Sequence, residues 1–355
     1  MNRRLTFRIS QETAGKTIRA FLREELAFSG HQISRLKFQE EGIRVDGEKA
    51  YVSRELREGE VLTIGLTEQV LRRDTEGGKP AKIWEAPAPE LAAYPLKVLY
   101  EDDDYLIVDK PAGMVCHPSP GHYNDTLANQ AAAHLGGTGT AMDIRVTGRL
   151  DRETSGIVTF ARSTEAAAMI QRQRADGRLI KTYLALAEGR FTAEDVSPSE
   201  SASSEAAFQA AEGVVDVPLR RESPGSHRMI CAQDGKPART FYRVLGETKA
   251  PDGSIRTLLT VRIEHGRTHQ IRVHMAHIGH SLAGDPLYGF RGAGDAQEND
   301  GRTVCCMTDE GDREPMGLHA FKLSFWHPFR AVPIEITAQV PAWADKIHKK
   351  DIEIG

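Results

Sequence analysis

A carboxylate stands between two arginines directly before an apolar run of the sequence. In residues 146–163, VTGRLDRETSGIVTFARS, Asp151 lies between Arg149 and Arg152 and precedes the strand-like residues 156–161. A carboxylate at the rim of a buried strand can be kept ionised by a nearby cation and can then act as a nucleophile or a base. A solvated Asx-type turn with a surface ion pair explains the same residues equally well. The segment alone leaves both interpretations open.

Five histidines lie within residues 265–280, HGRTHQIRVHMAHIGH, a density that suggests a metal site. Their spacing argues against one, because His274 follows His269 by five positions rather than four and no HExxH motif is present. Histidines on a partly buried helix more often make structural hydrogen bonds. We therefore predict no metal site and no metal-dependent hydrolase.

An apolar stripe in the same segment predicts a helix over residues 267–279, with Thr268 as its N-cap. The stripe consists of Ile271, Met275 and Ile278. Arg272 would point inward beside these residues and would need a carboxylate partner, because a buried unpaired charge is costly. Asp151 is the favoured partner, and Asp285 in the following AGDPLYG is the alternative.

Tyr183 lies in an alternating segment, KTYLALAEG, which predicts a strand over residues 181–189. The simplest role for its ring is core packing. A functional role would be to stack on a nucleic-acid base, with the hydroxyl kept for acid–base chemistry.

Residues 1–66 predict a compact unit of two short helices against a small sheet. Its polar helix faces could contact phosphates, although an ordinary solvated face explains them nearly as well, since the unit has twelve basic and ten acidic residues. The candidate phosphate-binding residues are Arg19, Arg23, Arg35 and Lys37.

Charge is unevenly distributed along the 355 residues, whose formal net charge is −4. Residues 143–190 hold nine Lys and Arg against six Asp and Glu, whereas residues 191–216 hold six acidic residues and no basic one. Acidic segments can lower the net charge of the whole chain while one face stays positive, so the net charge does not exclude binding to nucleic acid. No apolar run approaches the ~18 residues that span a bilayer. The four cysteines form no CxxC pair, which favours reduced thiols in the cytoplasm.

Short strands and a few helices follow one another without regular alternation after residue 95, which predicts an α+β domain with a mixed, largely antiparallel sheet. The expected domains are the unit at 1–66, a proline-rich linker at 67–95 and a large domain at 96–350. The expected helices lie in DTLANQAAAHL, STEAAAMIQRQRADG and RTHQIRVHMAHIG.

Taken together, these segments resemble the RluA family of pseudouridine synthases. Residues 1–66 resemble an RNA-binding module first described in a small-subunit ribosomal protein, most clearly in SRLKFQEEGIRVDGEKA. The ordered motifs of the large domain that resemble the family are VLYEDDDYLIVDKPAGMVCHP, GRLDRETSGIVTFA, KTYLALAEG, GRTHQIRVHMAHIGHSLAGDPLYG and GLHAFKLSFWHP.

The resemblance implies roles for single residues. Asp151 matches the catalytic aspartate, and Arg149 matches the arginine that enters the RNA stack in place of the target uridine. Tyr183 matches the tyrosine that packs on the uracil and is a candidate for proton abstraction, and Arg272 matches the partner of the aspartate. Gly148 departs from the pattern, because most members have histidine there.

The implied reaction detaches uracil from its ribose, rotates it and reattaches it through carbon, without cofactor or metal. The uridine must first leave its stack. The carboxylate would either attack the anomeric carbon or remove a sugar proton, and both routes stay open. We expect a cytoplasmic monomer, without membrane contact, acting on structured RNA, with large-subunit ribosomal RNA preferred over transfer RNA.

Two other functions compete with this expectation. One is a catalytically silent RNA-binding factor in ribosome assembly, which the presence of Asp151, Tyr183 and Arg272 argues against. The other is a glycosidase, which needs a pair of carboxylic acids, and no second acid lies in a comparable motif.

Overall fold

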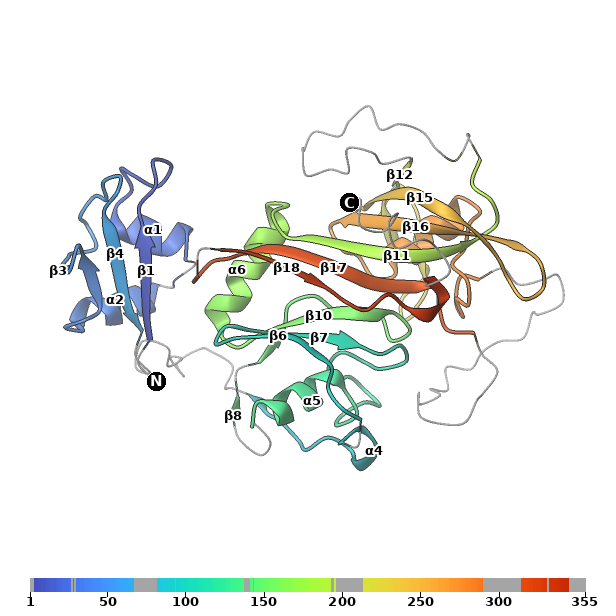
Figure 1. The fold of residues 1–355 in the computed structure, drawn as a ribbon, viewed down its shortest axis with the longest axis horizontal. Coiled ribbons are helices and arrows are strands. Elements are labelled where there is room, and N and C mark those ends of the chain that lie inside the picture. The colour runs from blue at the N-terminus through green and yellow to red at the C-terminus, as the bar shows by residue number, and fades with distance from the viewer. Residues whose placement is uncertain are drawn as a thin grey trace.

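The computed structural model describes residues 3–66 except 27 and 29, 82–136 except 93, 141–192 except 143, residue 195, 213–289, and 314–344 except 331. Figure 1 shows a small N-terminal sheet with two helices beside a much larger sheet. No helix in these ranges is long and apolar enough to cross a membrane.

The N-terminal unit is a four-stranded antiparallel sheet, in the order β1-β4-β2-β3, with two helices packed on it. The first helix begins after Thr17, whose hydroxyl accepts a hydrogen bond from the backbone N–H of Ala20 at 3.2 Å. The elements are β1 (Arg3–Arg8), α1 (Ile18–Glu24), α2 (Gly30–Phe38), β2 (Ile43–Val45), β3 (Glu48–Lys49) and β4 (Val61–Leu66).

The large sheet contains ten strands and runs β12-β15-β16-β11-β17-β10-β7-β6, with β18 beside β17 and β9 beside β10. Every pairing is antiparallel except that of β10 with β17. The strands are β6 (Val98–Glu101), β7 (Tyr105–Lys110), β9 (Arg145–Val146), β10 (Ser155–Ala161), β11 (Ile180–Glu188), β12 (Gly213–Asp216), β15 (Arg239–Lys249), β16 (Ile255–Glu264), β17 (Leu318–His327) and β18 (Val332–Thr337).

Strand β17 joins the two halves of the large sheet. It pairs with β11 on one side and with β10 on the other, and only two residue pairs form the parallel contact, Ser155 with His319 and Gly156 with Ala320. Gly156 has a φ of +103°, and a Cβ atom there would lie 2.3 Å from the carbonyl oxygen of Ala320. Only glycine permits the two strands to approach so closely at this point.

Helices and two small strand pairs complete the fold around the sheet (Figure 1). Helix α6 follows β10 closely, and its N-cap is Ser163, whose hydroxyl accepts a hydrogen bond from the N–H of Ala166 at 3.0 Å. The remaining elements are α4 (Pro89–Ala92), α5 (Leu127–His134), α6 (Thr164–Ala175), α7 (Gln270–His277), the 3-10 helix Ala342–Ala344, the pair β5 (Lys82–Ile83) and β8 (Ala141–Met142), and the pair β13 (Leu219–Arg221) and β14 (Met229–Cys231).

The mixed, largely antiparallel α+β fold predicted from the sequence is confirmed, and so are helices in all three segments that predicted them. Within the predicted linker, residues 82–92 carry β5 and α4, and Trp84 and Leu91 are buried. The prediction of Thr268 as a cap is wrong. Helix α7 begins after His269, which has a φ of +55° and makes no capping bond through its side chain.

Candidate active site

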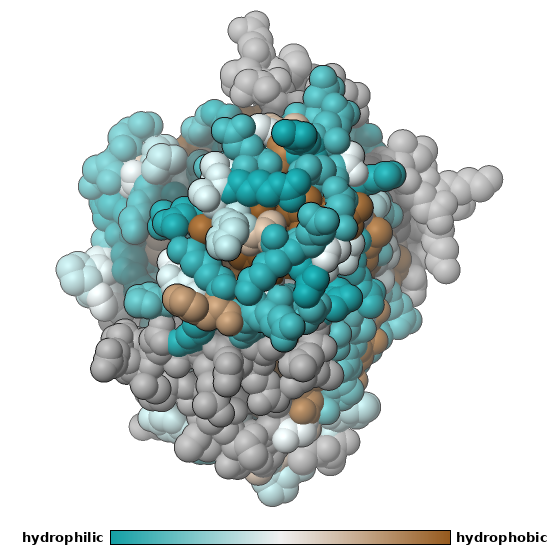
Figure 2. All heavy atoms as spheres, turned by 90° about the vertical axis from the view of Figure 1, so that its left-hand side faces the viewer, coloured by the Kyte–Doolittle hydropathy of each residue, from teal (hydrophilic) through white to brown (hydrophobic). Residues whose placement is uncertain are grey.

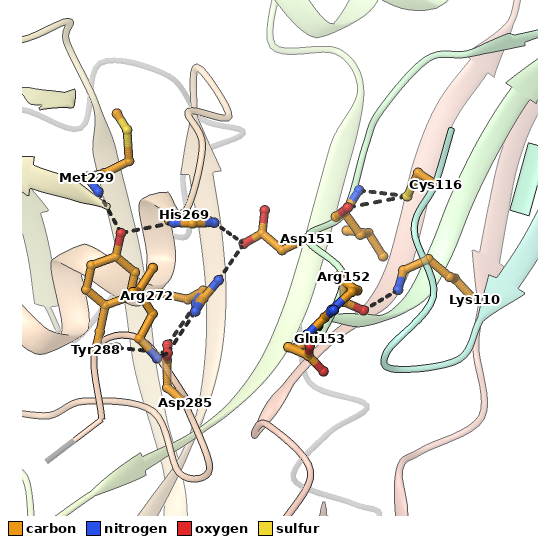
Figure 3. Close-up of polar contacts among 12 residues, drawn as sticks. Lys110, Cys116, Asp151, Arg152, Glu153, Met229, His269, Arg272, Asp285 and Tyr288 are labelled. Atoms are coloured by element: carbon orange, nitrogen blue, oxygen red, sulfur yellow. Dashed lines mark hydrogen bonds and ion pairs between the residues drawn. The ribbon is translucent and has the colours of Figure 1, made fainter. Parts of the chain in front are cut away.

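The backbone on both sides of Asp151 is fixed by two buried side chains (Figure 3). The Cys116 thiol bonds to both the N–H and the carbonyl oxygen of Leu150, each at 3.3 Å. The ammonium of Lys110, fully buried, donates to the carbonyl oxygen of Arg152 at 2.9 Å and to two other carbonyls. The residues before and after Asp151 are therefore both held in place, which fixes the backbone that carries its carboxylate.

The carboxylate of Asp151 faces α7. Its Oδ2 accepts a hydrogen bond from Nη1 of Arg272 at 3.4 Å and lies 4.0 Å from Nε2 of His269 (Figure 3). The side chain keeps 27 % of its surface exposed. A partly open carboxylate beside a fixed cation is held in one orientation and can still contact a substrate.

Arg272 is held in turn by Asp285, whose side chain is fully buried. Nε and Nη2 of the guanidinium each donate to Asp285 at 2.8 Å, a bidentate pair. Burial by itself would lower the pKa of Arg272, but the hydrogen bonds to Asp285 raise it overall. Burial would likewise raise the pKa of Asp285, and Arg272 lowers it. Arg272 therefore stays charged and presents its third nitrogen, Nη1, to Asp151.

His269 and Tyr288 support the other side of Arg272. The guanidinium lies 5.1 Å from the centre of the Tyr288 ring, and the Tyr288 hydroxyl bonds to Nδ1 of His269 at 2.9 Å. Burial lowers the pKa of His269, with Asp151 opposing this effect. The imidazole is thus mostly neutral near pH 7 and adds little charge beside the carboxylate.

Tyr183 lies in the middle of β11, beside an irregularity between Thr182 and Tyr183 in the pairing with β17. Its ring is 5 % exposed, and burial raises the pKa of its hydroxyl to about 12. At neutral pH the phenol is therefore protonated. The ammonium of Lys181 lies 5.7 Å from the ring centre.

One pocket brings these groups together. Its lining includes one carboxylate, Asp151, together with Tyr183 and His269. Four arginines also line it, Arg149, Arg174, Arg267 and Arg272. Because Asp151 is the sole acidic residue in this lining, the pocket is positively charged and suits an anionic ligand.

The structure places the candidate residues of the large domain in one site and those of the N-terminal unit elsewhere. Asp151, Tyr183, Arg272 and Arg149 line the pocket, with Arg149 exposed. The other four lie on the helices of the N-terminal unit, and Figure 2 shows that this side of the molecule is mainly hydrophilic. These four are Arg19 and Arg23 on α1, and Arg35 and Lys37 on α2.

Sequence reasoning did not assign Arg174, His269 or Tyr288 to this site. His269 precedes Arg272 by three residues, so helical spacing could have indicated that the two side chains are neighbours. Tyr288 lies three residues after Asp285 in the AGDPLYG segment. Because Asp285 was a candidate partner of Arg272, this segment was already expected near the site. Arg174 lies near the end of the helix predicted in STEAAAMIQRQRADG, and no motif in the sequence connects it with the pocket.

Two of the other histidines in residues 265–280 make hydrogen bonds within the protein. His274 is fully buried and bonds to Thr240 and to the carbonyl of Val217, and Nδ1 of His280 bonds to the carbonyl of Glu188. The group in the described residues with metal-ligand geometry lies elsewhere and comprises Asp102, Asp104 and His327.

The Asp102 carboxylate in that group is already engaged by the protein. Its Oδ1 accepts two backbone N–H groups at 2.8 Å, and its Oδ2 bonds to Tyr100 at 2.6 Å and His327 at 2.7 Å. These bonds fasten the turn between β6 and β7 to the end of β17. The free thiols Cys116 and Cys231 lie apart from it, and Cys305 and Cys306 lie outside the described residues.

Comparison with known proteins connects this site with one family. Residues 104–277 match the family model described as RNA pseudouridylate synthase. A protein of Nitrosomonas europaea named ribosomal large subunit pseudouridine synthase D is 38 % identical over 237 residues, which cover 66 % of this chain and 59 % of that protein. A protein of the same name from Xanthomonas campestris is 33 % identical over 297 residues, covering 84 % of this chain and 77 % of the relative.

Among solved structures, human RNA pseudouridylate synthase domain containing 1 is similar to this chain. It is 26 % identical, with a TM-score of 0.49, and the match covers 70 % of this chain and 84 % of the human one.

Proposed function

This chain belongs to the RNA pseudouridylate synthase family and is an RNA pseudouridine synthase, and we propose that its substrate is large-subunit ribosomal RNA, with Asp151 as the catalytic carboxylate. The observation that supports this most directly is the placement of Asp151. It projects into a positively charged pocket, 3.4 Å from an arginine that a second carboxylate holds in place.

The proposed chemistry is an isomerisation within one nucleotide. The bond between ribose C1′ and N1 of uracil breaks, a bond from C1′ to C5 forms, C5 loses its proton and N1 gains one. Asp151 acts at the ribose, where a carboxylate can attack C1′ or remove a neighbouring proton. Arg272 would orient the carboxylate for this step through Nη1, since two bonds to Asp285 hold the guanidinium in place.

Two further side chains would receive the extracted uridine. Tyr183 is buried at the pocket wall and offers its ring as a surface on which uracil can pack. Arg149 is exposed at the same pocket and would fill the gap that the uridine leaves in the RNA stack. Such a replacement offsets part of the unstacking cost of a few kcal/mol.

The names of the two bacterial relatives support ribosomal RNA of the large subunit as the substrate. An additional RNA-binding module at residues 1–66, ahead of a catalytic domain at 96–350, suits a large folded target. Arg19, Arg23 and Lys37 are exposed on its helices and, together with Arg35, would contact phosphates. They would add affinity without taking part in the chemistry.

Tritium release from transcripts labelled at C5 of uracil tests the proposal. Large-subunit ribosomal RNA, small-subunit ribosomal RNA and transfer RNA are supplied separately to the wild type, Asp151→Ala and Asp151→Asn. Asp176→Asn, an exposed aspartate paired with Arg178, is the matched control. We expect release from large-subunit RNA by the wild type and the control alone.

Three other outcomes would contradict parts of the proposal. Release only from transfer RNA would overturn the substrate, and release by both Asp151 variants would overturn the role of that carboxylate. No release from any transcript, with or without ribosomal proteins, would overturn the activity.

A further inference from the structure

The guanidinium of Arg174, a residue that lines the pocket, lies close to two glycines. Arg174 lies in the last turn of α6. A Cβ atom at Gly148 would lie 3.2 Å from its Nη2, and one at Gly266 would lie 3.6 Å from the same atom. Gly148 is next to Arg149, and Gly266 lies in the turn that precedes α7. The absence of side chains at both positions thus makes room for the guanidinium.

Most donors of Arg174 have no protein partner in the described part of the chain. A guanidinium carries five N–H groups. The hydrogen bond recorded for Arg174 is a long one, from Nη1 to the carbonyl oxygen of Thr147 at 3.4 Å, and no described carboxylate pairs with it. Arg272 in the same pocket differs, because Asp285 and Asp151 engage its Nε and both Nη atoms.

The charges around Arg174 also favour the binding of an anion. Asp151 is the one acidic residue in the lining and is already paired with Arg272. Lys181 adds a further cation nearby, and its pKa is lowered to about 7 by burial first and by Arg174 second. A half-buried cation without a counterion is unfavourable, so a bound anion would complete the site.

The planar fork of a guanidinium matches two oxygens of a phosphate. A neutral uracil carbonyl would satisfy one donor and leave the charge uncompensated, whereas a phosphodiester would satisfy two donors and neutralise it. The position beside Gly148 also places the guanidinium next to the exposed Arg149, where RNA would approach.

We propose that Arg174 binds a backbone phosphate of the uridine that enters the pocket and holds that nucleotide while Asp151 acts on its ribose. The proposal rests on the proposed function. Arg174 is an RNA-binding residue of the site, and it takes no part in the bond changes.

The test compares Arg174→Gln and Arg174→Lys with the wild type and with Arg178→Gln. Arg178 is an exposed arginine just beyond α6 that pairs with Asp176 at 2.7 Å, which makes it a matched control. Equilibrium binding of the transcripts is measured at several salt concentrations. Single-turnover tritium release over a range of enzyme concentrations separates binding from the chemical step.

For Arg174→Gln we expect half-saturation at an enzyme concentration at least about tenfold higher, with the maximal rate nearly unchanged. The slope of log K against log[salt] should become shallower by about 1, because one phosphate contact is lost. Arg174→Lys should keep the slope with weaker binding, and Arg178→Gln should match the wild type. An unchanged slope in Arg174→Gln, or a fall in the maximal rate alone, would overturn the proposal.

Gly148→Ala provides a second test that leaves the arginine in place. The added methyl group must push the guanidinium by a few tenths of an ångström, so binding should weaken in the wild-type background. The same change should have no effect in Arg174→Gln, because the two residues then no longer interact. Equal effects in both backgrounds would contradict the proposed geometry. Since binding is measured apart from turnover, failure of the activity itself would be seen separately, as absent tritium release by the wild type.

Discussion

Arg272 donates hydrogen bonds to two carboxylates, Asp285 and Asp151, that differ in burial. Asp285 takes two of its donors at 2.8 Å and is itself fully buried, while Asp151 takes the third at 3.4 Å and remains partly open. Asp285 also accepts the backbone N–H groups of Leu287 and Tyr288. The position of Arg272, and through it the orientation of Asp151, is therefore set from the AGDPLYG segment.

Asp285→Asn should destabilise the protein by about 3–5 kcal/mol, because it leaves a buried guanidinium without its main counterion. The single-turnover rate should also fall on the order of tenfold to a hundredfold as Asp151 loses its fixed partner. Urea unfolding and tritium release measure the two effects. Asp216→Asn, which breaks an exposed pair with Arg239, is the control and should cost less than about 1 kcal/mol. Equal losses in the two variants would contradict this account.

Lys181 predicts a pH dependence of stability. Burial, followed by Arg174, lowers its pKa from 10.5 to about 7 in the folded protein, so between these values the unfolded chain binds more protons. Stability from this group therefore rises with pH over that range. Lys181→Met should be more stable than the wild type at pH 7, and the difference should shrink towards pH 10.

Urea unfolding of both proteins at pH 7, 8.5 and 10 measures this difference. Lys97→Met is the control, because Lys97 is half exposed and paired with Asp109. A difference between Lys181→Met and the wild type that stays constant with pH would contradict the shifted pKa of Lys181.

At the residue scale, the carboxylate partners of Arg272 could be predicted from the sequence. Both carboxylate partners considered for Arg272 contact it, because a guanidinium has enough donors for two. The place of Arg174 could not be predicted. Its contact with the pocket depends on how α6 crosses the segment at Gly148, and that packing is not encoded in any local spacing.

At the scale of elements, the approach of β10 to β17 depends on a single glycine. A Cβ atom at Gly156 would lie 2.6 Å from the nitrogen of Ala320 as well as 2.3 Å from its oxygen, and both belong to the backbone of a central strand. Neither strand can yield easily, because β7 holds β10 and β11 holds β17 on their outer sides.

Gly156→Ala should therefore lower the free energy of unfolding by at least about 2 kcal/mol, the sum of strain at positive φ and displacement of the strands. Gly177→Ala is the control, since its φ is +71° and no atom lies within 4 Å of the added methyl group. It should cost about 1 kcal/mol. Thermal and urea unfolding compare them, and a cost for Gly156→Ala no larger than the control would contradict this explanation.

The elements themselves followed from periodicity, but their exact ends did not. The apolar stripe predicted α7 at the right place in the sequence. The predicted start of the helix was wrong, because His265, Gly266 and His269 all adopt positive φ. Such a tight turn is imposed by the contacts of α7 with the neighbouring strands, which override the preference for a threonine cap.

At the scale of the whole molecule, one side-chain hydrogen bond connects the N-terminal unit with α6 of the large domain. The amide of Gln32 in α2 donates to the carboxylate of Glu165 in the first turn of α6, the helix that carries Arg174 at its other end. RNA bound by the proposed module would thus be tethered to the domain that holds the pocket.

Replacing Arg19 and Arg23 together by glutamine should weaken RNA binding and make the salt slope shallower by about 1 to 2. The maximal single-turnover rate should not change, because neither residue lies at the pocket. Arg54→Gln is the control, since Arg54 pairs with Glu60 on the same unit at 2.8 Å. Binding and tritium release measure the effects, and an unchanged salt slope in the double variant would contradict a phosphate-binding role for α1.

The strand order of the large sheet could not be predicted from the sequence. Alternating segments indicate strands, but they do not indicate that β17 lies between β10 and β11. That choice depends on pairings between residues that are 133 to 164 positions apart, for which local patterns carry no information.

The central place of β17 has a consequence for protein synthesis. Asp151 belongs to the half of the sheet with β10, whereas Tyr183 and Arg272 belong to the half with β11 and β16. A nascent chain synthesised as far as residue 317 already contains every proposed catalytic residue, but it lacks the strand that sets the two halves in register. Because synthesis proceeds from the N-terminus, the proposed RNA-binding unit can fold long before the pocket is assembled. The growing chain would therefore be able to bind RNA before it is able to catalyse the reaction.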